Sequence, residues 1–67
     1  MFRLNATLIR KLLLERKLSI RQLAKQSGLN EFTARKVIDD DSTVTMRTLA
    51  TLAKFFNVDG ELLILKE

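Results

Sequence analysis

The sequence predicts an all-α fold, a compact bundle of four to five short helices. The chain of 67 residues has no proline and only two glycines, and these residues disfavour helices most strongly. It has no cysteine and is 46% hydrophobic, so its stability must come from packed aliphatic side chains rather than from disulfides. Its apolar residues recur at helical spacing. We therefore expect residues 1–67 to form a single domain.

The first helix is expected to begin at Asn5 or Thr7, because a short polar side chain there accepts a hydrogen bond from a free first-turn amide. The helix should run to about Lys17. Only one of the adjacent Leu13 and Leu14 can face the core well. The apolar stripe of this helix comprises Leu8, Ile9, Leu12 and Leu13.

The next two helices are short and are joined by a tight turn. Ser19 and Gln22 have the spacing of a capping box and predict the start of the second helix. This helix should end at Gly28, because glycine readily takes the left-handed conformation of a helix end. Asn30 then caps a third helix that runs to Ile38. The residues expected to face inward are Leu23, Ala24, Ala34, Val37 and Ile38.

Residues 39–43 are the most polar stretch of the chain and predict a loop. Thr45 caps a fourth helix that should stop at Asn57. Asp59 caps a final short turn through Leu63. The fourth helix has apolar residues at the spacing of one buried face, namely Met46, Leu49, Leu52, Ala53 and Phe56.

Both ends of the chain contain apolar residues at strand spacing. Phe2 and Leu4 alternate with polar residues, and Leu63 and Leu65 are spaced in the same way. A short β pairing, either between the two ends of the chain or between two subunits, would bury both segments. We therefore expect a small terminal β pairing beside the helices.

The composition favours a nucleic-acid partner over an enzyme. The net charge is +4, which suits a polyanion. No histidine or cysteine is present, and no serine or carboxylate lies next to a positioned base, so we expect neither catalysis nor a metal or other cofactor. No apolar run approaches the ~20 residues of a membrane span, and the first residues lack the layout of a secretory signal. We therefore expect a cytoplasmic protein.

The second and third helices have the residue types of a helix-turn-helix. Two helices that cross steeply on a tight turn need a small residue at the crossing, supplied by Ala24, and a residue tolerant of positive φ, supplied by Gly28. Leu29, Ala34 and Val37 should hold the third helix against the domain. Its opposite face should then point outward, and that face consists of Glu31, Phe32, Arg35 and Lys36.

Two segments resemble the lambda-repressor-like family, also called the Xre or Cro type of helix-turn-helix. Residues 18–30 (LSIRQLAKQSGLN) are similar to the family's Leu-Ser-x-x-x-Leu-Ala-x-x-x-Gly-Val-Ser. Residues 48–58 (TLATLAKFFNV) are similar to its Thr-Leu-x-x-Leu-Ala-x-x-Leu-Gly-Val. The chain differs from the family at Ile20, where glutamine is usual, and at residues 39–41, where three aspartates replace Asn-Gly and a basic residue.

The resemblance implies binding to double-stranded DNA, as a homodimer that regulates transcription. In this family the second helix of the motif enters the major groove and reads base edges. The base-reading positions would be Asn30, Glu31, Phe32, Arg35 and Lys36. The start of the motif's first helix and the loop into the fourth helix hold phosphates in the family. Those positions correspond to Ser19, Ile20, Arg21, Thr43, Thr45 and Arg47.

Other interpretations of the same residues remain open. Arg35 and Lys36 could form an ordinary solvated face. Phe32 could be a wedge against a base, a core residue or part of a protein interface. The acidic residues 39–41 and Glu31 suit a basic protein surface better than phosphate. The alternative function is therefore a protein-interaction module, an antirepressor or antitoxin that binds a partner repressor or toxin.

Overall fold

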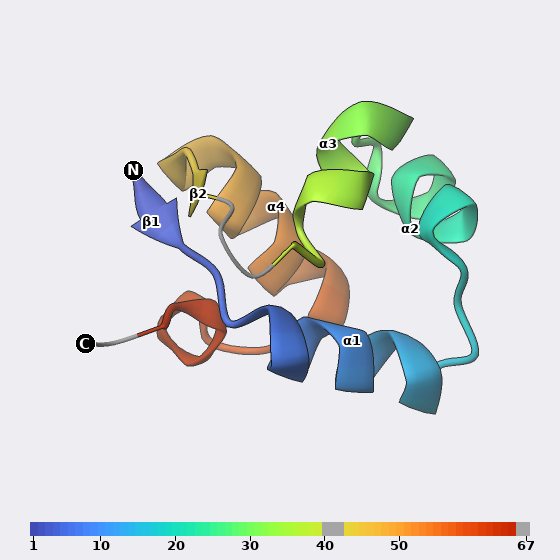
Figure 1. The fold of residues 1–67 in the computed structure, drawn as a ribbon, viewed down its shortest axis with the longest axis horizontal. Helices are drawn as coiled ribbons and strands as arrows, with labels where there is room; N and C mark the ends of the chain where they lie inside the picture. The colour runs from blue at the N-terminus through green and yellow to red at the C-terminus, as the bar shows by residue number, and fades with distance from the viewer. Residues whose placement is uncertain (40–42, 66–67) are drawn as a thin grey trace.

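The computed structural model of the chain describes residues 1–39 and 43–65, and its helices confirm the all-α prediction. The described residues form α1 (Ala6–Glu15), α2 (Ile20–Ser27), α3 (Glu31–Lys36) and α4 (Met46–Phe56), followed by a 3-10 turn, η1 (Gly60–Leu63). Two short strands, β1 (Phe2–Arg3) and β2 (Thr43–Val44), pair antiparallel. Figure 1 shows α1 on one side of the molecule and α3 on the other.

Every helix begins at the polar residue that the sequence predicts. The side-chain oxygens of these residues accept hydrogen bonds from backbone amides of the first turn. Those amides have no partner within the helix, so the caps satisfy them. Asn5 rather than Thr7 caps α1. The five capping bonds are Asn5 with Leu8, Ser19 with Gln22, Asn30 with Thr33, Thr45 with Thr48, and Asp59 with Glu61.

The core lies where the apolar faces of the helices meet. Leu13 is 6% exposed whereas Leu14 is 78% exposed, so only the first of the two adjacent leucines reaches the core, as expected. Met46 is 68% exposed, which makes the prediction of its burial wrong: it lies in the first turn of α4, beyond the core packing. The largest fully buried side chains are Phe56, Leu4, Ile9, Leu23, Leu52, Leu63 and Val37.

The terminal β pairing is present, with one partner that the sequence did not indicate. Leu4 forms a bridge with Ile64, and the amide of Leu65 donates to the carbonyl of Arg3 at 2.8 Å, so the two ends of the chain do meet. The predicted loop, however, ends one residue too late. Thr43 belongs to β2 and pairs with Arg3, while the buried Val44 pairs with Phe2.

Two helices are shorter than predicted. The third was expected to reach Ile38, but α3 ends at Lys36, and the amide of Asp39 donates to the carbonyl of Lys36 in a tighter turn. The first was expected to reach Lys17, but α1 ends at Glu15. Lys17 takes a left-handed φ of 55° that closes this helix. In the described part of the chain, no helix is long and apolar enough to cross a membrane.

A long-range contact joins the end of α1 to the end of α4. The guanidinium of Arg16 donates to the carbonyl of Phe56 at 2.6 Å and lies over its ring, 5.3 Å from the centroid. A longer bond reaches the carbonyl of Phe55 at 3.4 Å. A helix C-terminus has unpaired carbonyls and a negative dipole end, so a cation stabilises it. Arg16, although exposed, therefore stabilises the end of α4.

Candidate nucleic-acid interface

The turn between α2 and α3 depends on Gly28. This residue ends α2 with a φ of 85° in the left-handed region, and its amide donates to the carbonyl of Ala24 at 3.1 Å. A Cβ added at Gly28 would have no heavy atom within 4 Å. The position therefore requires glycine for its backbone conformation and not for space. Gly28 is a helix terminator, as predicted.

Gly28→Ala is expected to lower the free energy of unfolding by about 1–2 kcal/mol, because an L-residue is strained in the left-handed region. Urea denaturation followed by circular dichroism measures this change. Gly60→Ala is the matched control, since the added Cβ would meet Ala53 and Leu49 at ordinary contact distances of 3.6 Å and 3.7 Å. An equal loss at both glycines would show that the Gly28 turn has no special conformational requirement.

The turn places α3 with one face in the core and one face in solvent. Ala34 and Val37 are both 0% exposed, and the helix packs against α2. Leu29, in the turn itself, packs against the core. The four residues predicted to point outward do so; all are exposed, and they are Glu31, Phe32, Arg35 and Lys36. Asn30, the cap of α3, is exposed as well.

Both cations of α3 contact a residue one turn earlier on the same helix. Arg35 Nη2 lies 3.1 Å from Glu31 Oε1, and these side chains are 70% and 43% exposed respectively. Lys36 Nζ lies 4.7 Å from the centroid of the Phe32 ring. An exposed ion pair of this kind contributes only about 0.3–0.5 kcal/mol to stability, and an exposed cation–π contact about 0.5–1 kcal/mol. These contacts matter because they give the side chains of both cations a defined conformation before any partner binds.

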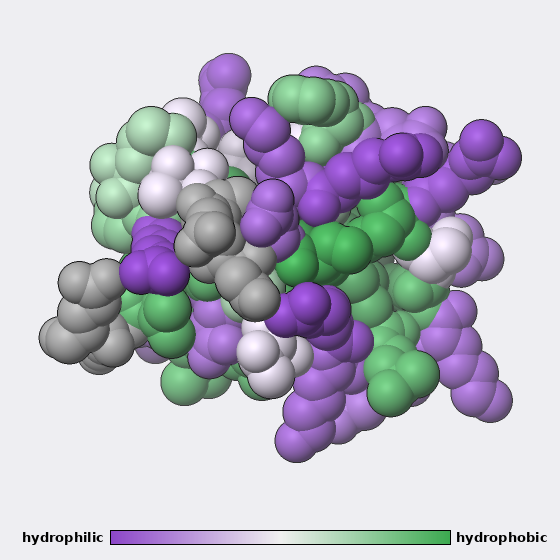
Figure 2. Space-filling model, in the orientation of Figure 1, coloured by the Kyte–Doolittle hydropathy of each residue, from purple (hydrophilic) through white to green (hydrophobic). Residues whose placement is uncertain are grey.

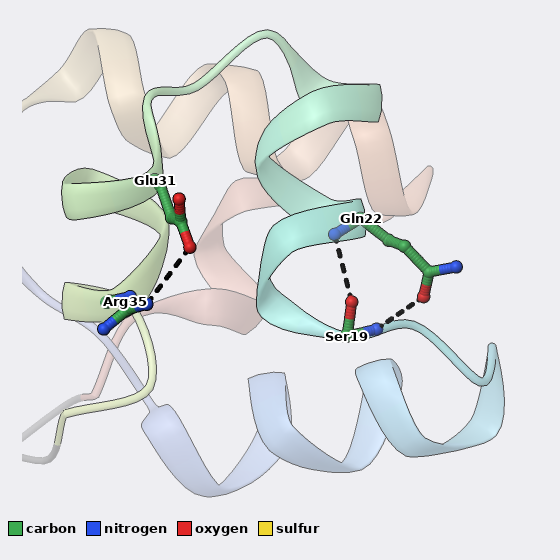
Figure 3. A network of polar contacts seen from close by, with 4 residues as sticks. All are labelled: Ser19, Gln22, Glu31 and Arg35. Atoms are coloured by element: carbon green, nitrogen blue, oxygen red, sulfur yellow. Dashed lines mark hydrogen bonds and ion pairs between the residues drawn. The ribbon is translucent and has the colours of Figure 1, made fainter.

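The start of α2 adjoins this face of α3. Ser19, Ile20 and Arg21 line one open hollow together with Glu31 and Arg35. Figure 3 shows the Glu31–Arg35 pair on α3 near the start of α2, where Ser19 and Gln22 form their reciprocal capping bonds. The structure thus brings together three of the predicted phosphate-binding residues and two of the predicted base-reading residues. The positive end of the α2 dipole makes this hollow favourable for an anion.

The remaining predicted phosphate-binding residues lie around the start of α4. Thr45 accepts a hydrogen bond from the amide of Thr48 at 3.3 Å, and Arg47 is exposed in the first turn of the helix. Thr43 lies in β2, and its hydroxyl contacts Met1 Sδ at 3.8 Å. In the view of Figure 1, α3 lies between α2 and this end of α4. The two predicted phosphate-binding groups therefore flank the predicted reading helix.

One of the basic residues near α2 and α3 is engaged elsewhere in the fold. Residues 16–36 carry six basic side chains and one acidic side chain, but Arg16 is engaged at the end of α4. The engagement of Arg16 depends on contacts with residues far away in the chain, and the sequence carries no signal for it. Asp39 is exposed, whereas the rest of the predicted acidic segment, residues 40 and 41, lies outside the described residues. In Figure 2 the side formed by α2 and α3 carries hydrophilic side chains, interrupted by hydrophobic surface at the top over α3 and between α3 and α1.

Comparison with known proteins agrees with this geometry. A family model described as a Cro/C1-type HTH DNA-binding domain matches residues 8–67, which include α2, α3, α4 and all but the first two residues of α1. Searches of the curated proteins and of the solved structures found no match. The matched range contains the capping box of α2, the Gly28 turn and the exposed face of α3. The chain therefore belongs to the family of Cro/C1-type helix-turn-helix DNA-binding domains.

Proposed function

We propose that this protein is a sequence-specific transcriptional regulator that inserts α3 into the major groove of operator DNA. The observation that carries the proposal is the division of α3 into two faces. Ala34 and Val37 are fully buried, while Arg35 and Lys36 are exposed, and Arg35 lies on the side that adjoins the start of α2. A short helix held in this way presents its polar side chains to a groove wide enough to admit it.

Each group around α3 then has a chemical role. Arg35 or Lys36 can donate to guanine O6 and N7, and Phe32 can contact a thymine methyl group. Asn30 uses its Oδ1 atom to cap α3, which leaves its amide hydrogens for base edges. Ser19, Ile20 and Arg21 bind phosphate on one side of α3, and Thr43, Thr45 and Arg47 bind it on the other.

A dimer would extend this recognition to two half-sites. Members of this structural class place their reading helices about 34 Å apart, one turn of the double helix. We propose that this protein acts as a homodimer on an operator with this spacing. Its regulatory effect follows from occupancy of that DNA.

DNA binding should depend strongly on salt. Labelled duplex DNA titrated at several salt concentrations, with fluorescence anisotropy as the readout, is expected to give a linear fall of log K with log salt. Two to four phosphate contacts per subunit correspond to a slope of about −2 to −4 per subunit. The absence of binding at low salt, or binding without a salt slope, would contradict the proposal.

A second candidate function, capture of a partner protein, is favoured by one observation. Phe32 is 69% exposed on the same face of α3, and Glu31 places a carboxylate beside it. A large exposed aromatic side chain is typical of protein interfaces. A partner repressor or toxin would then contact Phe32 in place of the DNA groove. Loss of partner binding in Phe32→Ala, with retention in Arg35→Ala/Lys36→Ala, distinguishes this function from DNA binding.

A further inference from the structure

Glu31 is an unusual residue on a surface that meets a polyanion. It is the acidic member of the exposed α3 face, and it lines the hollow that also contains Ser19, Ile20 and Arg21. A carboxylate there repels phosphate and lowers the affinity for any DNA sequence. General affinity for DNA therefore does not explain why a glutamate is present on this face.

The structure shows what the carboxylate does in the free protein. Glu31 Oε1 accepts a hydrogen bond from Arg35 Nη2 at 3.1 Å. A glutamate in the first turn and an arginine in the last turn both match the helix dipole, and their spacing of four residues places them on one face. The contact needs no rearrangement of the fold, because both residues belong to the same rigid helix (Figure 3).

Restraint of Arg35 affects specificity more than affinity. A guanidinium is a planar fork that matches the O6 and N7 atoms of guanine when its plane is aligned with the base. A free arginine must lose rotamer freedom to reach that alignment, whereas a held arginine has lost part of it already. An acidic partner also disfavours contacts that leave the guanidinium turned toward phosphate.

We propose that Glu31 is a positioning residue that holds Arg35 for bidentate recognition of guanine, and that it does not itself read a base. This inference rests on the proposed function and deepens it, because it names one base that the α3 face selects. The alternative is that Glu31 reads a base directly, with its carboxylate accepting a hydrogen bond from cytosine N4. The two roles predict different effects of removing the carboxylate charge.

The test is selection of binding sites from a randomised duplex DNA library, run in parallel with the wild-type protein and with Glu31→Gln. The wild type is expected to enrich a site with guanine at the Arg35 position, preferred about tenfold or more over other bases. Glu31→Gln should reduce this preference to about threefold or less. The same variant should bind random-sequence DNA about two- to fivefold more tightly, because it lacks the repulsive charge.

Two further variants complete the design. Glu15→Gln removes an equal charge from α1, where it is exposed, and should leave the guanine preference unchanged. Arg35→Lys keeps the charge but lacks the planar fork, so it should weaken the guanine preference. In the Arg35→Lys background, Glu31→Gln should change no base preference any further.

The outcomes separate this inference from the proposed function. An enriched wild-type site that Glu31→Gln leaves unchanged would overturn the inference alone. The inference would also be overturned if Glu31→Gln abolished a preference for cytosine, and did so in the Arg35→Lys background as well. Glu31 would then read a base directly. A wild-type selection that enriches no sequence would overturn both the inference and the proposed function.

Discussion

Replacement of both Arg35 and Lys36 by alanine is expected to lower the affinity for DNA by about two to four orders of magnitude, since each side-chain contact to a base is worth about 1–3 kcal/mol. Both residues are exposed and contact side chains of their own helix. Their removal should therefore leave the core unchanged. The double variant should show the circular dichroism spectrum of the wild type and a shallower salt slope in the anisotropy titration.

The matched control removes two positive charges elsewhere. Lys11 lies on α1 and Lys54 lies in the last turn of α4, and both are exposed. Lys11→Ala/Lys54→Ala should weaken binding by less than about tenfold, because distant charges are largely screened at physiological salt. An equal loss in the two double variants would show that net charge, and not the α3 face, determines DNA binding.

Phe56→Ala is expected to lower the free energy of unfolding by about 3–5 kcal/mol, the usual cost of removing a buried phenylalanine ring. The ring is 1% exposed, and it lies beneath the Arg16 guanidinium. Domains of this length have a total stability of only about 3–10 kcal/mol. The variant should therefore be partly unfolded at room temperature, and thermal and urea denaturation followed by circular dichroism measure the loss.

The neighbouring residue supplies the control for this prediction. Phe55 is half-buried and meets Phe56 edge to face, with ring centroids 5.1 Å apart. Phe55→Ala removes the same atoms from the adjacent position and should cost less than half as much. If Phe55→Ala proved as destabilising as Phe56→Ala, the assignment of Phe56 to the centre of the core would be wrong.

The local features of the fold were predictable because neighbouring residues determine them. The Ser19–Gln22 capping box and the left-handed Gly28 each involve groups within four residues of one another. The orientation of α3 followed from the same kind of pattern, since Ala34 and Val37 are three residues apart on one helical face. Ser19 and Gly28 are also among the residues by which residues 18–30 resemble the family, and the family match confirms the resemblance.

One error arose from a partner distant in the chain, and two others concern the ends of helices. Thr43 was placed in a loop because its own surroundings are polar, yet pairing with Arg3 makes it part of a strand. Met46 fits the apolar spacing of α4, but it lies in the first turn of the helix and is exposed. Lys17 closes α1 in a left-handed conformation that is usual for glycine and gives no signal in a lysine.

The sequence by itself determined four of the five helix caps, the Gly28 turn and the exposure of Arg35 and Lys36, because each depends on contacts within one or two helical turns. Tertiary structure alone decided that Arg16 caps the far end of α4, 40 residues away, and that the start of α2 meets α3 in one hollow. These arrangements depend on how whole helices pack. Packing is the sum of many weak contacts across the core, and no single residue pattern encodes it.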